Sequence, residues 1–168
     1  MASTTPNTIL LAVNGEKRPI YEAEADEALT PGELVRFDTD DELEPHGTAG
    51  GYAAKMFVVE NPYVDPSSTK AIDTDYALGS YARYIWAQTG DLVYAWLADG
   101  ENVAKGAPLM SDGAGALKAF AAVSQAVDEG GSATYTITVP DAVIVAYADE
   151  DKNNSAGGAR ARIKVRVA

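Results

Sequence analysis

The stretch from residue 89 to residue 117 constrains the fold more than any other part of the chain. Two apolar rows alternate at its start, Leu92, Tyr94 and Trp96 in one and Val93, Ala95 and Leu97 in the other. Because successive side chains of a strand point to opposite faces, this pattern predicts a strand that is buried on both faces. Asp99-Gly100 and the segment 112–115 then predict tight turns. Short strands joined by closely spaced turns are typical of a small barrel or sandwich.

The rest of the chain repeats this pattern of short apolar segments and turns. Residues 8–13 and 19–21 flank Asn14-Gly15, which predicts a hairpin that opens the sheet. Residues 117–127 are rich in alanine and also fit a helix, but we favour a strand. The sequence therefore predicts an all-β fold, a compact barrel or sandwich of short antiparallel strands with long loops. We expect residues 9–168 to form one β-rich domain and residues 1–8, which are small and polar, to be a flexible arm.

The composition excludes several classes of function. The chain has 13 Lys+Arg against 25 Asp+Glu, a formal net charge of −12, so its field repels nucleic acid. No apolar run is long enough to span a membrane. The chain has no cysteine, which excludes thiolate metal sites and disulfides. The acidic surface also suits a protein that works in high salt, such as one from a haloarchaeal or marine host.

Neither catalysis nor metal binding is predicted. The sequence lacks a nucleophile elbow, a P-loop and a zinc-protease motif, so we expect no enzyme and no cofactor. Asp38, Asp40 and Glu42 alternate as in a calcium loop, but Leu43 stands where an EF-hand needs glycine, which favours a solvated acidic turn. His46 is the only histidine and is expected to be a loop residue.

The last strand predicted from the sequence concentrates positive charge. Arg160, Arg162, Lys164 and Arg166 alternate with Ala161, Ile163, Val165 and Val167, so the cations line one face. Two interpretations stay open: the cations neutralise acidic side chains of neighbouring strands, or they meet an acidic surface of a partner. The loop 61–70 is a second candidate contact because of its length, and its exposed candidates are Tyr63 and Pro66.

The central stretch also carries a family resemblance. It rests on Gly90-Asp91, Val93–Leu97, Gly100, Val103, Gly106, Leu109, Ser111, Gly113, Gly115 and Leu117, with Ile72-Asp73, Tyr76 and Gly79 before them and 154–157 and 161–165 after them. In these residues the chain resembles the head decoration, or capsid cement, proteins of tailed viruses. It departs from their pattern at Ala107 and Ala114.

The resemblance implies a structural virion protein. Proteins of this kind are trimeric β-barrels that bind the outer surface of the assembled head and stabilise it, so the implied partners are the major capsid protein and two further copies of the chain. A lipoyl- or biotinyl-like carrier, or another small β-barrel binding module, is the alternative, because Gly100, Val103, Lys105-Gly106 and Leu109 are similar to part of the carrier pattern. Lys118 would then be the modified lysine, although its neighbours differ from those expected.

Overall fold

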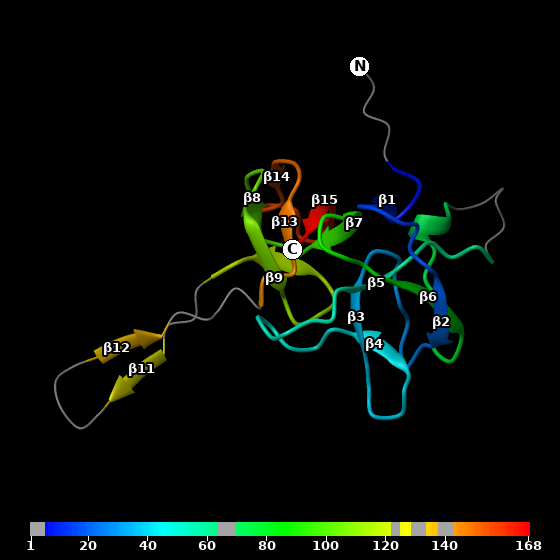
Figure 1. The fold of residues 1–168 in the computed structure, drawn as a ribbon, viewed down its shortest axis with the longest axis horizontal. Coiled ribbons are helices and arrows are strands. Elements are labelled where there is room, and N and C mark those ends of the chain that lie inside the picture. The colour runs from blue at the N-terminus through cyan, green and yellow to red at the C-terminus, as the bar shows by residue number, and fades with distance from the viewer. Residues whose placement is uncertain (1–5, 64–69, 122–124, 129–133, 138–142) are drawn as a thin grey trace, which may run out of the picture.

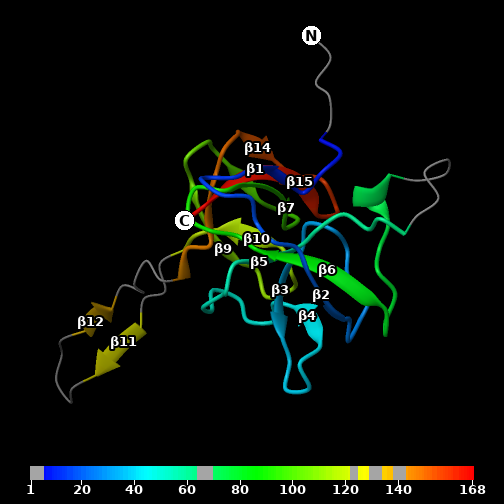
Figure 2. The same cartoon turned by 45° about the vertical axis from the view of Figure 1, so that its right-hand side comes forward.

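The computed structural model describes residues 6–63, 70–121, 125–128, 134–137 and 143–168. Within these residues the fold is nearly all β, as predicted, and the helical structure is limited to short 3-10 turns such as η1 (Ala71–Asp73). None of the helical structure described is long and apolar enough to cross a membrane. The strands form two main sheets that lie side by side (Figures 1 and 2).

The first sheet closes into a five-stranded barrel. Its strands are β7 (Leu92–Leu97), β10 (Leu117–Ala119), β9 (Pro108–Ser111), β13 (Ala146–Ala148) and β15 (Ala161–Val167). Pairing of β15 with β7 closes the ring, and every pairing is antiparallel except that of β10 with β7. Strand β1 (Leu10–Ala12) adds to the β7 edge next to β10. A closed ring has no free edges, which removes the sites at which strands aggregate.

The second sheet is antiparallel and also curls round. Its order is β2 (Tyr21–Glu24), β6 (Tyr81–Trp86), β5 (Met56–Val58), β3 (Leu34–Phe37) and β4 (Leu43–Pro45). A bridge between Ala25 and Leu43 joins the regions of its two edge strands. Two small ribbons complete the fold, β8 (Asn102–Val103) with β14 (Lys152–Asn153) and β11 (Gln125–Asp128) with β12 (Thr134–Ile137).

Strand alternation builds two hydrophobic clusters. Leu34, Phe57 and Ile85 of the second sheet pack with Val93 and Leu97 of the barrel, so one cluster joins the two sheets. Their sequence neighbours in β3, β5 and β6 point to the opposite face and form the second cluster, which contains Val35, Met56, Val58 and Tyr84. The second sheet is therefore covered on both faces.

Two expectations from the sequence need correction. Strands β1 and β2 do not form the hairpin predicted around Asn14-Gly15, because β1 pairs with β7 and β2 pairs with β6 of the other sheet. Strand β7 is fully buried on one face only: Val93, Ala95 and Leu97 have no exposed surface, whereas Leu92, Tyr94 and Trp96 are partly exposed. The guanidinium groups of Arg160 and Arg162 lie over the Trp96 ring and cover part of this second face.

His46 lies in the loop directly after β4, as expected, and is buried. Its Nε2 lies 2.8 Å from the carbonyl oxygen of Tyr52, which accepts the ring N–H, and its Nδ1 lies 2.7 Å from Ser111 Oγ at the end of β9. The hydroxyl therefore donates to Nδ1, and it also accepts from the Gly113 N–H at 3.1 Å. This chain of hydrogen bonds ties the second sheet to the barrel.

Replacing Ser111 with Ala is expected to lower the free energy of unfolding by between about 1 and 2 kcal/mol, because the buried His46 Nδ1 and the partly buried Gly113 N–H lose their partner. Urea unfolding followed by tryptophan fluorescence measures the change. Ser155→Ala, which removes an exposed hydroxyl, is the control and should have little effect. Equal midpoints for the two variants would contradict a stabilising role for the Ser111 hydroxyl.

Candidate partner interface

The basic strand predicted from the sequence is β15, and its alternation is confirmed. Ile163, Val165 and Val167 point into the core, and the cations lie on the other face. Arg162 pairs in register with Trp96, and Lys164 pairs with Tyr94. The cationic face of β15 thus lies next to the aromatic face of β7.

Arg162 is buried, with 8% of its surface exposed. Its guanidinium carbon lies 4.1 Å from the centre of the Trp96 ring and 5.7 Å from that of Tyr94. It donates hydrogen bonds to the carbonyl oxygens of Pro31, at 2.8 Å, and of Ile72. Burial lowers the pKa of Arg162, and the carboxylate of Asp73, 3.7 Å away, opposes this shift. The side chain therefore binds the barrel to the turn at Pro31 and to η1, and little of its surface stays accessible.

Arg160 reinforces the same contact. Its guanidinium donates to the carboxylate of Glu33 and to Thr30 Oγ1, the latter at 2.7 Å, and it lies 4.7 Å from the Trp96 ring centre. Trp96 Nε1 donates to the Pro31 carbonyl at 3.0 Å. Burial raises the pKa of Glu33, and the hydrogen bond from Arg160 opposes that rise. Two cations and one indole thus fix the 30–33 turn on the barrel.

Lys164 and Arg166 remain accessible, with 37% and 51% of their side chains exposed. Lys164 Nζ lies 3.3 Å from Glu150, and Arg166 Nη2 lies 3.4 Å from Asp149. All four cations therefore have an acidic neighbour within the chain, as in the first of the two interpretations. These carboxylates come from turns and from η1, however, and not from the neighbouring strands β7 and β13 as that interpretation expected. A role for this face in binding a partner stays a prediction, and Lys164, Arg166 and the partly exposed Arg160 are the residues available for it.

The second candidate contact is only partly described. Pro66 lies outside the described residues, whereas Tyr63 is 74% exposed. Tyr63 and Tyr81 line an open cleft of about 510 Å³ together with Glu22, Asn61, Asp75 and Tyr76. The sequence predicted Tyr63 as a contact residue but gave no signal that β2, β6 and the loops 61–63 and 75–80 would meet there.

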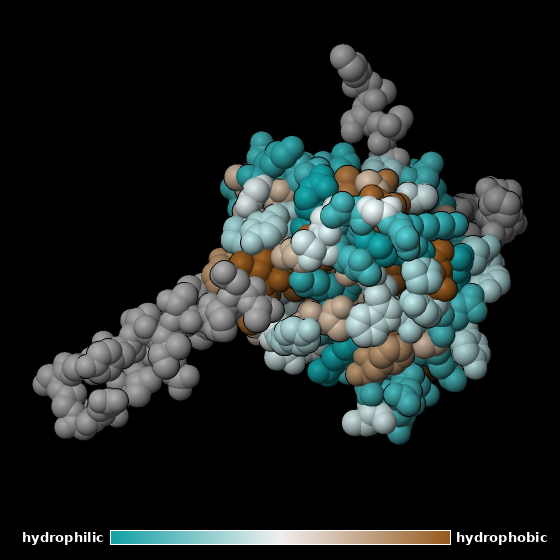
Figure 3. All heavy atoms as spheres, in the orientation of Figure 1, coloured by the Kyte–Doolittle hydropathy of each residue, from teal (hydrophilic) through white to brown (hydrophobic). Residues whose placement is uncertain are grey.

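The aromatic residues between 76 and 86 divide between core and surface. Tyr76 and Tyr84 are buried, whereas Tyr81 and Trp86 are 63% and 45% exposed. Burial raises the pKa of Tyr76, whose hydroxyl donates to the Glu60 carbonyl at 2.9 Å. Exposed Tyr and Trp are enriched where proteins bind each other. The face in Figure 3 is largely hydrophilic, with separate hydrophobic patches.

The acidic residues 38–42 form the turn between β3 and β4. The Asp38 carboxylate accepts from the backbone N–H groups of Asp40 and Glu42, at 2.9 and 2.8 Å. Carboxylate oxygens of Asp26, Asp38 and Glu42 lie within 4.8 Å of one another, and among the described residues this is the group whose spacing could hold a cation. Asp40, which the alternation in the sequence included, is not in this group. Burial and the neighbouring carboxylates raise the pKa of Glu42.

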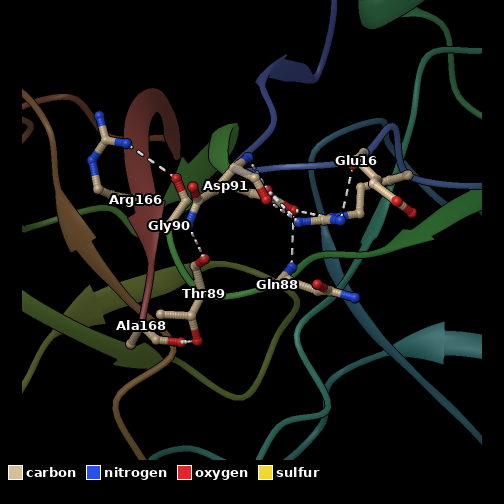
Figure 4. Close-up of polar contacts among 9 residues, drawn as sticks. Glu16, Gln88, Thr89, Gly90, Asp91, Arg166 and Ala168 are labelled. Atoms are coloured by element: carbon tan, nitrogen blue, oxygen red, sulfur yellow. Dashed lines mark hydrogen bonds and ion pairs between the residues drawn. The ribbon is translucent and has the colours of Figure 1, made fainter.

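A buried ion pair at one end of the barrel is a feature that the sequence analysis missed. Asp91 is completely buried and accepts from Arg18 Nε and Nη2, at 2.8 and 3.0 Å, and from the backbone N–H groups of Asn14 and Gln88. Figure 4 shows Asp91 at the centre of this network. Burial alone would raise the pKa of Asp91, but these hydrogen bonds outweigh it and hold the pKa below its usual range. The only sign of this network in the sequence was that Gly90-Asp91 is among the residues that carry the family resemblance.

The lysine required by the carrier alternative is not at a hairpin tip. Lys118 is the middle residue of β10 and pairs with Met110 of β9. In a strand it lacks the reach that a swinging cofactor arm needs.

Comparison with known proteins leaves the family open. No model of a known protein family matches the chain. A search of curated proteins also finds no match.

Proposed function

We propose that the chain is a structural virion protein that binds the outside of an assembled capsid and stabilises it. The proposal starts from the resemblance in the sequence. A closed barrel with a single hydrophobic cluster joining it to the second sheet supports it, because such a body is rigid. A rigid body binds without a large cost in conformational entropy.

The observation that carries the proposal is the pair of exposed tyrosines at the open cleft. Tyr63 and Tyr81 keep 74% and 63% of their surface accessible although they lie on a well-packed sheet and its neighbouring loop. Tyrosine supplies a large contact area with few rotatable bonds, so it is a frequent anchor in protein interfaces. We infer that this face binds the capsid.

Stabilisation would follow from mass action. A protein that binds only the assembled shell lowers the free energy of that shell relative to its dissociated subunits. A contact burying roughly 1,600 Å² in total is sufficient for a specific interface. Three copies placed around a local threefold axis would clamp several capsid subunits at once, and their effective concentrations would strengthen the binding.

The test is co-sedimentation of the purified protein with empty expanded heads, after its oligomeric state has been measured by light scattering at low and at multimolar salt. We expect a trimer that sediments with heads. The Tyr63→Ala/Tyr81→Ala double variant should bind more weakly, by about tenfold or more, since anchor residues contribute more than 1 kcal/mol each. Tyr52→Ala is the matched control, because Tyr52 is 76% exposed and does not line the cleft. A monomer that stays in the supernatant would contradict the proposal.

A further inference from the structure

The cleft beside β2 and β6 is built from four separate segments. Glu22 comes from β2, Tyr81 from the start of β6, Tyr63 from the loop after β5, and Asp75 from the segment after η1. The cleft is open to solvent and measures about 510 Å³. That volume lies in the range of sites that bind small molecules or single large side chains.

Its floor is fixed by hydrogen bonds. Asn61 Nδ2 donates to the Asp75 carbonyl at 3.2 Å, and Asn61 Oδ1 accepts from the Tyr63 N–H at 3.0 Å. The buried Tyr76 hydroxyl donates to the Glu60 carbonyl. The backbones that carry Asp75 and Tyr63 are thereby held in place before anything binds, which reduces the entropy lost on binding.

The groups that reach the opening are acidic or aromatic. Glu22, Asp75, Tyr63 and Tyr81 are all exposed, and none of the described residues that line this cleft is a cation. Among the described residues, the cation paired with a residue of the cleft is Arg83. Its Nε lies 3.9 Å from Glu22 Oε1, and its side chain is 24% exposed. This separation is longer than a hydrogen bond. Glu22 Oε1 does accept from the Tyr63 hydroxyl, at the long distance of 3.5 Å, and the remaining lone pairs of the carboxylate can accept from another donor.

Two carboxylates and two tyrosine rings in one cleft favour the binding of a cation, and a flat guanidinium suits these groups better than an ammonium does. A cation is attracted to the faces of tyrosine rings and to carboxylates at the same time. A planar guanidinium stacks on an aromatic ring and donates two parallel hydrogen bonds to a carboxylate, which a lysine ammonium cannot do. The protein already makes this arrangement internally, since Arg160 stacks on Trp96 while it pairs with Glu33.

Charge complementarity identifies the source as a basic partner. The chain has a net charge of −12, and each of its own arginines already has a carboxylate within 4 Å. The outward field is therefore acidic, which steers a positively charged surface toward this protein.

We propose that the cleft lined by Glu22, Tyr63, Asp75 and Tyr81 binds an arginine side chain of a partner protein. The proposal deepens the proposed function and rests on it, because the partner would be a shell subunit. Glu22 and Asp75 accept the hydrogen bonds of the guanidinium, and the two tyrosine rings enclose its flat faces.

The direct test uses the peptide acetyl-Gly-Arg-Gly-amide, titrated into the full chain and followed through the ring resonances of Tyr63 and Tyr81 by NMR. We expect the peptide to shift these resonances, and the same peptide with citrulline, which is neutral but has the same shape, to bind about tenfold more weakly or not at all. Equal binding of the citrulline peptide, or no shift with the arginine peptide, would overturn the proposal. The same peptide with lysine in place of arginine tests the preference for a guanidinium, and equal binding of this peptide would overturn that preference.

Charge-removing variants complete the test. Glu22→Gln with Asp75→Asn should weaken arginine binding by about tenfold or more, whereas Glu16→Gln, an exposed carboxylate that does not line the cleft, should not change it. In the sedimentation assay the double variant should also lose affinity for heads. If it binds heads as the unmodified protein does, the arginine site is wrong and the decoration function stands; if neither protein binds heads, the decoration function itself is wrong.

Discussion

Replacing Asp91 with Ala should lower the free energy of unfolding by about 4 kcal/mol, the largest effect we expect from any single substitution. Removing one member of a buried ion pair leaves the other charge without compensation, which typically costs 3–5 kcal/mol. In this case the variant also leaves the Asn14 and Gln88 N–H groups without their acceptor. Urea unfolding at neutral pH measures the loss.

The matched control is a surface pair. Glu44→Ala removes the partner of Arg36, whose side chain is 44% exposed, so we expect a loss below about 1 kcal/mol. If Asp91→Ala costs no more than this control, the Asp91 network does not stabilise the fold.

The pH dependence of the Asp91 effect follows from its lowered pKa. A carboxyl whose pKa is lower in the folded state stabilises the protein above its unfolded pKa, about 4, and this contribution disappears as the pH falls through the folded value. Asp91→Asn lacks the titrating group. The stability difference between the unmodified protein and this variant should therefore be constant from about pH 5 to 7 and narrow below about pH 4. A difference that stays constant down to pH 2 would contradict the role of the ionised carboxylate.

Replacing Arg162 with Ala should lower the free energy of unfolding by about 3 kcal/mol. The substitution leaves the carbonyl oxygen of the buried Ile72 without its donor, which costs roughly 1–3 kcal/mol. The Pro31 carbonyl loses one of its two donors and keeps the Trp96 N–H. It also removes the cation from the Trp96 ring, worth roughly 0.5–2 kcal/mol. Because the terms overlap, the total is smaller than their sum.

Two further variants separate the shape of the Arg162 side chain from its charge. Arg162→Lys keeps the charge but cannot reach both carbonyls with a planar fork, so we expect an intermediate loss. Arg166→Ala removes an arginine from the same face of β15 that is 51% exposed, and should cost less than about 1 kcal/mol. Equal losses for Arg162→Ala and Arg166→Ala would mean that the contacts to the 30–33 turn contribute nothing to stability.

The Trp96 fluorescence maximum should shift to the red in Arg162→Ala, as the ring becomes more exposed to water.

Local patterns of the sequence determined which segments are strands and which faces they bury. The alternation in β15 placed Ile163, Val165 and Val167 in the core, and the glycines that follow Asp99 and Asp112 adopt the positive φ angles that tight turns need. Asp112 also accepts from the N–H groups of Ala114 and Ala116, which fixes the β9–β10 hairpin. These features depend on neighbours two to four residues apart, so the sequence alone contains them.

Only the tertiary structure decided which strands pair and which charges meet. A hairpin signal at Asn14-Gly15 is present, yet β1 and β2 enter different sheets, since β1 pairs with β7 and β2 pairs with β6. Arg160 meets Glu33 and Arg18 meets Asp91 across long separations in the sequence. Alternation fixes the face of a strand but not its partner, since strand pairing depends on the packing of residues that are distant along the chain. For the same reason the sequence marked Tyr63 as exposed, while the cleft that it shares with Glu22, Asp75 and Tyr81 exists only in the folded protein.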